Sequence, residues 1–238
     1  MQKLELLKKW VQESNRIVFF GGAGVSTESG IRDFRSPDGL YNHKFDYPPE
    51  TIISRSFFQS NPEYFFEFYK ERMLPLGFEP NITHKKLAQW ESEGKLLRVI
   101  TQNIDGLHQK AGTRSISELH GSVLRNYCVC CGKGYSAEFV KENVGIPKCS
   151  CGGIIKPDVV LYEESLSNEA IESSVAAIEK CDLLIVAGTS LTVYPAAGLI
   201  NYYNGNRLVL INREATPYDS RADLVFHNSL GDVFSQLP

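Results

Sequence analysis

Short apolar segments alternate with stretches of helical periodicity along this chain. This alternation restricts the possible folds more than any other feature of the sequence. The apolar segments are residues 16–20, 96–101, 116–119, 182–187, 207–211 and 224–226. Helices are expected at 4–11, 83–93 (capped by Thr83), 104–111, 168–180, 195–203 and 232–237. Strands separated by helices predict an α/β fold, with a parallel sheet that carries helices on both faces.

Two stretches break the alternation and predict insertions. Residues 36–80 are rich in aromatic residues and proline, which favours a small, largely helical module. Residues 122–157 hold most of the cysteines and several glycines. We therefore expect a sheet domain formed by residues 1–35, 81–121 and 158–238, interrupted by the two insertions. A chain of 238 residues is long enough for this arrangement.

The charge balance argues against a nucleic-acid partner. The chain has 25 lysines and arginines against 28 acidic residues, a net charge of −3. Residues 1–10 mix charges with leucines, which indicates a surface helix and not a signal peptide. No apolar run approaches the roughly 18 residues that a membrane helix needs. We expect a soluble, cytoplasmic protein, by default a monomer.

A glycine loop follows the first strand. The pattern Gly22-x-Gly24 lets the backbone approach a dinucleotide pyrophosphate, whose phosphates the next amides would face. Thr27 stands where the usual fingerprint has a third glycine, so a plain glycine turn is the alternative. The residues Asp33, Phe34 and Arg35 just beyond the loop favour ligand contact over core packing.

Polar residues also follow the second and later strands. Gln102, Asn103 and Asp105 come after residues 96–101, and a carboxamide such as nicotinamide suits an Asn–Asp pair. The alternative is that Asn103 or Asp105 caps the following helix. Gly188, Thr189, Ser190 and Asn212 end two further strands and suit a phosphate or ribose, with plain turns as the alternative.

One histidine stands out. His120 precedes Gly121 after a short strand, and histidine is the usual general base near neutral pH. A structural histidine is the alternative interpretation. The other histidines (His43, His84, His108 and His227) are interpreted as structural or surface residues.

The cysteine spacing predicts a metal site. Cys128-x2-Cys131 and Cys149-x-Cys151 form two close pairs, typical of a tetrahedral thiolate zinc site. Four protein ligands leave no open position, so the Zn²⁺ would be structural. Cys130 could replace Cys128 or Cys131 as a ligand. Cys181 is expected to be a buried apolar filler.

Taken together and in this order, the motifs resemble the sirtuin family of NAD-dependent protein deacylases. The matching stretches are GAGVSTESGIRDFR (22–35), TQNIDGLH (101–108), HG (120–121), the four cysteines, KPDVV (156–160) and GTSLTVYPAAG (188–198). The resemblance implies a Rossmann-like large domain, plus a small domain made of a helical insert (36–80) and a zinc-binding insert (122–157). NAD and an acyl-lysine peptide would enter the cleft between them.

The resemblance also implies residue roles. NAD would be held by Ala23, Gly24, Thr27, Phe34, Arg35, Gln102, Ile104, Asp105, His120, Gly188, Thr189, Ser190, Asn212 and Asp232. His120 would be the general base, with Asn103 and Asp105 in the catalytic set. Val159 and Val160 would flank the lysine of a peptide that adds as a strand between the domains. The implied products are nicotinamide, O-acyl-ADP-ribose and free lysine.

Two local features bear on the acyl substrate. After Val160 many sirtuins read x-Phe-Gly-Glu, whereas this chain reads Leu161-Tyr162-Glu163-Glu164. The pair Tyr69 and Arg72 resembles the tyrosine-x-x-arginine of sirtuins that remove succinyl and other acidic acyl groups, because a hydroxyl and a guanidinium can bind a carboxylate. Solvated residues on a helix are the alternative.

Two rival functions share parts of this pattern. A protein mono-ADP-ribosyltransferase would use the same NAD pocket, but His120 favours deacylation. A non-catalytic sensor of acyl-lysine or NAD has little need of a base at this position. Nucleic-acid binding through the zinc knuckle is disfavoured by the scarcity of basic residues there.

Overall fold

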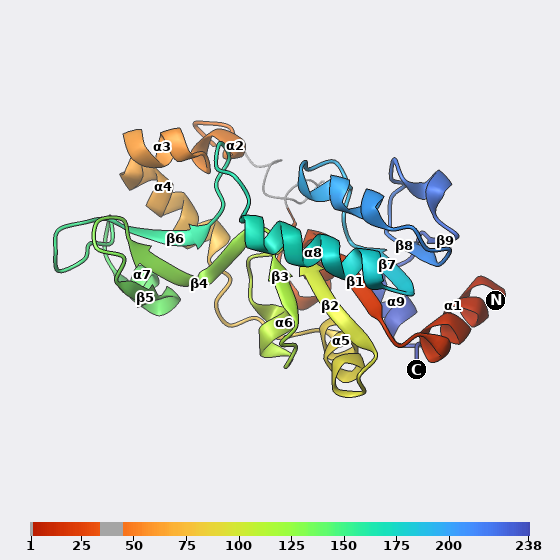
Figure 1. Ribbon diagram of the computed structural model, residues 1–238. Helices are drawn as coiled ribbons and strands as arrows, with labels where there is room; N and C mark the ends of the chain where they lie inside the picture. Colours follow the sequence, from red (N-terminus) through yellow and green to blue (C-terminus); the bar gives the residue numbers. More distant parts are fainter. Residues whose placement is uncertain (1, 34–44) are drawn as a thin grey trace.

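The computed structural model describes residues 2–33 and 45–238 (Figure 1). Its large sheet has the strand order β3-β2-β1-β7-β8-β9, and every pairing in it is parallel, as predicted. The strands are β1 (Ile17–Gly21), β2 (Leu96–Thr101), β3 (Ile116–Glu118), β7 (Leu183–Ala187), β8 (Leu208–Ile211) and β9 (Leu224–Phe226). This is the order of a Rossmann-like sheet.

Helices cover both faces of the large sheet, which confirms the predicted layering. On one face α1 (Gln2–Glu13), α5 (Ile82–Ser92) and α9 (Leu230–Phe234) share a core with Ile17 and Phe19. On the other, α8 (Asn168–Lys180) and the 3-10 helix η5 (Ala196–Tyr202) pack on Val18 and Phe20. Because both faces are buried, β1 is apolar throughout and does not alternate.

The two insertions together form a second unit, to the left of the large sheet in Figure 1. It contains an antiparallel sheet of β4 (Gly121–Cys128), β5 (Gly134–Ser136) and β6 (Ile155–Val159) with α7 (Ala137–Glu142). Its other helices are α2 (Pro49–Ile52), α3 (Arg55–Ser60), α4 (Pro62–Phe68) and the π-helix η4 (Tyr69–Met73). Phe65 and Phe66 from the helical insertion share one core with Val123 of β4 and Val140 of α7. The insertions are therefore far apart in sequence but packed as one body.

The strand order reverses between β1 and β7, and this point defines the main crevice of the sheet. From β1 the order runs outward through β2 to β3, and from β7 through β8 to β9. In open α/β sheets ligands bind outside the carboxyl ends of the strands at such a point. The loops that begin at Gly22 and Gly188 both start there.

Several helix limits differ from those expected. Asn81, not Thr83, caps α5, because its side chain accepts from the Thr83 and His84 N–H groups. α6 (Leu107–Lys110) is a single turn that starts after Gly106, whose φ of 75° is left-handed. α9 starts at Leu230, earlier than expected, after the cap Ser229. The glycine loop continues into the 3-10 turns η1 (Ala23–Val25) and η2 (Thr27–Ser29).

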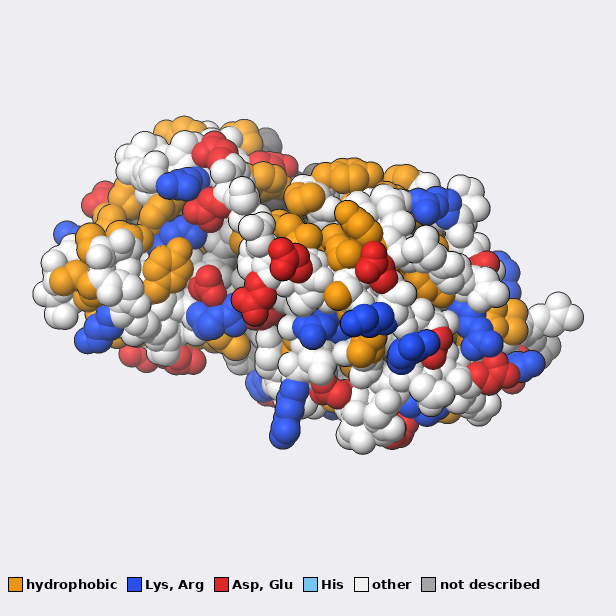
Figure 2. Space-filling view, viewed as in Figure 1, with side chains coloured by type: hydrophobic (Ala, Val, Ile, Leu, Met, Phe, Trp, Pro, Cys, Tyr) orange, Lys and Arg blue, Asp and Glu red, His pale blue; other side chains and the backbone are white. Residues whose placement is uncertain are grey.

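The surface agrees with the weak net charge. Figure 2 shows basic and acidic side chains interspersed on one face, without a continuous basic patch there. Within residues 2–33 and 45–238, no helix is long and apolar enough to cross a membrane.

The observed cap of α5 generates a stability prediction. Asn81 also donates from Nδ2 to the Val25 carbonyl (2.7 Å) and to Ser29 Oγ (3.0 Å), so it links α5 to the glycine loop. Asn81→Ala should lower the free energy of unfolding by about 1–2 kcal/mol in urea denaturation. The control Thr83→Val should cost little, since the buried Thr83 hydroxyl has no hydrogen-bond partner among the described residues. A larger loss for Thr83→Val than for Asn81→Ala would contradict this assignment.

Candidate functional site

A cleft of about 610 Å³ lies at the carboxyl ends of β1, β2 and β7 and extends to the second unit. The site residues expected from the sequence that line it are Ala23, Gly24, Thr27, Arg72, Gln102, Asn103, Ile104, Asp105, His120, Val159, Val160, Gly188, Thr189, Ser190 and Asn212. Residues from seven separate segments thus meet in one cavity, whose volume is in the usual range of ligand pockets.

Besides the four cysteines, two described residues expected at the site, Asp232 and Tyr69, do not line the cleft. Phe34 and Arg35 lie outside the described part of the chain. Asp232 lines a second groove beside α1, because α9 starts at Leu230 and it is Leu230 that reaches the cleft. Tyr69 is only 1% exposed and lies in the core of the second unit.

The end of β2 is fixed by a hydrogen-bond network that reaches the glycine loop. The Ser26 hydroxyl donates to Asp105 Oδ2 (2.6 Å) and accepts from Asn103 Nδ2 (3.1 Å). Asp105 Oδ1 accepts from the Leu107 N–H (2.8 Å) at the start of α6, so the cap and ligand-contact interpretations of Asp105 are compatible. Ser26 was missing from the expected site, although a hydroxyl inside a glycine loop is a usable signal.

Burial and hydrogen bonding act in opposite directions on Asp105. Burial raises the pKa of its carboxyl, while the Ser26 hydroxyl and the Leu107 N–H lower it, and burial has the larger effect. The carboxyl is held in one orientation at the base of the cleft by both donors.

His120 is held in one tautomer by the backbone. Its Nδ1 lies 2.9 Å from the Gln102 carbonyl oxygen, which can only accept, so Nδ1 carries the proton. The other ring nitrogen, Nε2, is then unprotonated and free to take a proton. Burial lowers the pKa of His120, which the Gln102 carbonyl partly offsets. The imidazole is therefore neutral at neutral pH, as a general base must be.

Gln102 joins two strand ends and leaves one donor for a ligand. Its Oε1 accepts from Thr189 Oγ1 (3.0 Å), which ties the end of β2 to the loop after β7. Its Nε2 is buried and has no partner within the described residues. A buried amide donor without a partner is costly unless a bound molecule accepts from it. The cleft thus fits a polar ligand such as a dinucleotide.

The segment after β6 forms the wall opposite the glycine loop. Val160 donates from its N–H to the carbonyl of His120 (3.0 Å), so this wall is attached directly to that residue. Tyr162 pairs with Ser54 as a parallel bridge, and its N–H donates to the Ile53 carbonyl. We call residues 159–164 the substrate segment, after the binding role that is proposed for it below.

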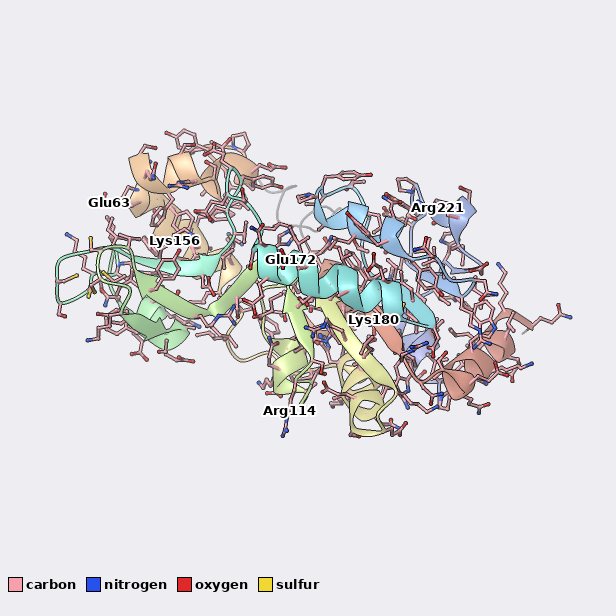
Figure 3. All side chains as sticks on the ribbon, in the orientation of Figure 1. Glu63, Arg114, Lys156, Glu172, Lys180 and Arg221 are labelled. Atoms are coloured by element: carbon pink, nitrogen blue, oxygen red, sulfur yellow. The ribbon has the colours of Figure 1, made fainter. Side chains whose placement is uncertain are left out.

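Four cysteines gather at the end of the three-stranded sheet, where Figure 3 shows the sulfur atoms grouped. The Sγ atoms of Cys128, Cys131, Cys149 and Cys151 all lie within 4.8 Å of one another. That spacing fits tetrahedral Zn²⁺ with four thiolates and no open position, so the ion would be structural. Cys130 is not in the set; its N–H instead lies 3.4 Å from Cys128 Sγ. Cys181 is buried, as expected of a filler.

A glycine loop at the reversal of a Rossmann-like sheet, facing a tautomer-fixed histidine, defines a dinucleotide-using enzyme. The Sir2 family model matches residues 22–195. This chain belongs to the Sir2 family, which confirms the resemblance to the sirtuins.

Close relatives and solved structures agree with that membership. An "NAD-dependent protein deacetylase" of Clostridium acetobutylicum is 58% identical over 98% of this chain and 97% of its own length. A second "NAD-dependent protein deacetylase", of Cutibacterium acnes, is 51% identical over 97% of this chain and 96% of its own length. A Sir2 structure with p53 peptide and NAD⁺ superimposes with a TM-score of 0.87 at 38% identity, covering 99% of this chain and 97% of that one.

The cysteine geometry generates a metal prediction. Purified protein should contain about one zinc ion per chain, and Cys131→Ser should lose most of it. The thermal midpoint should then fall by roughly 2–4 °C for each kcal/mol that the metal contributes. The control Cys130→Ser should keep both zinc and thermal midpoint. If Cys130→Ser lost the metal and Cys131→Ser kept it, Cys130 and not Cys131 would be the zinc ligand.

Proposed function

We propose that this chain, an NAD-dependent protein deacylase of the Sir2 family, uses His120 as its general base in removing acyl groups from protein lysines. The single observation that carries the assignment is the Gln102 carbonyl at 2.9 Å from Nδ1, which leaves Nε2 unprotonated in the cleft. The products are nicotinamide, O-acyl-ADP-ribose and free lysine.

Different residues of the cleft would bind NAD, orient it and accept a proton from it. Bound NAD supplies a ribose carbon that the acyl oxygen can attack as nicotinamide departs. The loop at Ala23 and Gly24 offers backbone N–H groups to phosphates, and Gln102 Nε2 offers a buried donor. Asn103 and Asp105 are oriented by Ser26 and would bind the carboxamide and the ribose of NAD. His120 Nε2 takes a proton from a ribose hydroxyl, so that the oxygen can attack the acyl carbon.

The acyl-lysine partner is proposed to bind along the substrate segment. Val159 and Val160 line the cleft beside His120 and would flank the lysine side chain. A peptide in extended form can add to this segment by main-chain hydrogen bonds. The support from relatives is a Sir2 solved with deacetylated p53 peptide and 3′-O-acetyl-ADP-ribose.

We also propose that the two units bind different substrates. The part built on the large sheet, including the start of α9, holds NAD, and the body made of both insertions holds one side of the peptide. Separate hydrophobic cores support this division. β4 begins at Gly121 and β6 ends at Val159, so the small sheet extends slightly beyond the predicted insert of 122–157. None of the six cysteines, all of which the structure describes, forms a disulfide, which supports a cytoplasmic location.

Acidic acyl groups are a further part of the proposal. Arg72 lines the cleft with a side chain that is 33% exposed, and its guanidinium contacts Glu71 Oε1 at 2.9 Å. Tyr69 lies three residues earlier in η4; its hydroxyl is buried without a partner in the described residues, and burial raises its pKa. A carboxylate at the end of the acyl chain would give the Arg72 guanidinium a second carboxylate partner, whereas Tyr69 does not line the cleft.

The lowered pKa of His120 sets the pH dependence. Because the base must be neutral, kcat/KM for an acetyl-lysine peptide should fall on acidification, with a midpoint below 6.5 and a limiting slope of about tenfold per pH unit. His227→Gln, at an exposed histidine outside the cleft, should leave the profile unchanged. A midpoint clearly above 6.5 would contradict the effect of burial.

Mass spectrometry of matched peptides tests the reaction and the acyl preference together. An acetyl-lysine peptide and its succinyl twin should each lose the acyl group only with NAD, and O-acyl-ADP-ribose should appear. Arg72→Met should lower kcat/KM for the succinyl peptide by about 10- to 100-fold and spare the acetyl peptide. Arg114→Met, at an exposed arginine that does not line the cleft, is the matched control.

Other outcomes of the same experiment have definite meanings. Equal losses on both peptides with Arg72→Met would end the carboxylate hypothesis. If ADP-ribose appeared on protein without acyl loss, the chain would be a mono-ADP-ribosyltransferase. If neither reaction occurred, the non-catalytic sensor of acyl-lysine or NAD would be favoured.

A further inference from the structure

We infer that Glu163 is a positioning residue, which ties the substrate segment to helix α3 and so sets how tightly the enzyme holds an acyl-lysine peptide. The inference rests on the proposed function of the substrate segment. It concerns a glutamate at the position where many sirtuins carry glycine.

The backbone of Glu163 adopts a conformation that favours glycine. Its φ is 73°, and among the described residues only Leu191 is another non-glycine residue with positive φ. In this left-handed region the Cβ of an L-residue crowds its own backbone. A glutamate there indicates that its side chain makes interactions that offset the steric cost.

The Glu163 side chain makes two hydrogen bonds to one residue of α3. Its Oε2 accepts from the Ser56 N–H at 2.9 Å, and its Oε1 accepts from the Ser56 hydroxyl at 2.8 Å. Both carboxylate oxygens are therefore used on a partner 107 positions away in sequence. Charge-assisted bonds of this kind are stronger than neutral ones, and glycine could make neither.

These bonds extend a short backbone pairing between the two segments. The Tyr162 N–H donates to the Ile53 carbonyl and the Arg55 N–H donates to the Tyr162 carbonyl, both at 3.0 Å. With the Glu163 pair, four hydrogen bonds join the end of the substrate segment to the start of α3. Ile53, Tyr162 and Glu163 all line the cleft, so a shift at this junction changes the cleft wall.

The next residue anchors the segment in the opposite direction. Glu164 Oε2 accepts from Lys156 Nζ (3.1 Å) and from the Leu161 N–H (2.9 Å), which attaches the segment to β6. Lys156, labelled in Figure 3, is itself buried and also donates to the Val159 carbonyl. Two consecutive glutamates thus hold one segment to two different elements. Of the two, only Glu163 reaches the helical insert.

Loss of the Glu163 anchor should affect the peptide and not NAD. The contacts of His120 with Gln102, and of Val160 with His120, do not involve Glu163. We expect Glu163→Gly to raise the KM for an acetyl-lysine peptide about 3- to 10-fold, with kcat and the KM for NAD nearly unchanged. Glu163→Gln keeps one acceptor oxygen and should lie between glycine and wild type.

A double-mutant cycle separates the anchor from a general structural role. Ser56→Ala should raise the peptide KM about 2- to 3-fold in the wild-type background. In the Glu163→Gly background it should add almost nothing, because the hydroxyl has already lost its partner. A peptide KM within twofold of wild type for Glu163→Gly, an equal rise in the KM for NAD, or additive effects in the cycle would each overturn the inference.

Peptide binding keeps this test distinct from that of the proposed function. The Kd of a fluorescent acetyl-lysine peptide for wild type and variants is measured by anisotropy alongside turnover. If wild type binds the peptide but does not deacylate it, the proposed function fails, while the ratio of Kd values still decides the role of Glu163. If wild type does not bind the peptide, the inference fails. Should Glu163→Gly not fold, Glu163→Gln and Ser56→Ala must show the same direction of change.

Discussion

The cleft depends on a backbone contact at the point where the strand order of the large sheet reverses. The Gly24 N–H donates to the Gly188 carbonyl at 2.8 Å, which fixes the loop after β1 against the loop after β7. A Cβ on Gly24 would lie 2.7 Å from the Gly188 Cα, so only glycine permits this approach. The Thr189 hydroxyl then brings in the Gln102 side chain, and the Gln102 carbonyl fixes His120. His120 is thus positioned by a continuous chain of contacts that begins at two glycines.

The wall opposite this chain depends on a core shared by two insertions. Phe65 from one insertion and Val123 from the other are fully buried in the same cluster, which also includes Val159 at the start of the substrate segment. The four thiols at the far end of the small sheet fit a zinc ion that would stiffen a region with little apolar core of its own. The cleft is thus lined on one side by loops of the large sheet and on the other by a unit with a separate core.

Much of the fold and of the site could be predicted because the relevant signals are local. Each buried strand of the large sheet is a short apolar run, and each glycine or small polar loop follows directly after one. The cysteine pairs are separated by one and two residues, so their chemistry is visible without a fold. The predicted helix limits were wrong where two residues are both good caps, or where a helix is too short to show a periodic pattern. Asn81 and Thr83 are both good caps, and α9 has only five residues from which to judge its facing side.

The sequence by itself determined the class of fold, and it predicted the dinucleotide loops, His120 as the base and four cysteines as metal ligands, because these features depend on residue type and short spacing. Only the tertiary structure decided which donors meet which acceptors across the chain. Ser26 reaches Asp105 over 79 positions, and Glu163 reaches Ser56 over 107. Such contacts have no periodic trace in the sequence, since they arise when separate elements pack and bring their ends together. The same reason explains why Leu230 and not Asp232 faces the cleft: packing of α9 against the sheet sets its rotation.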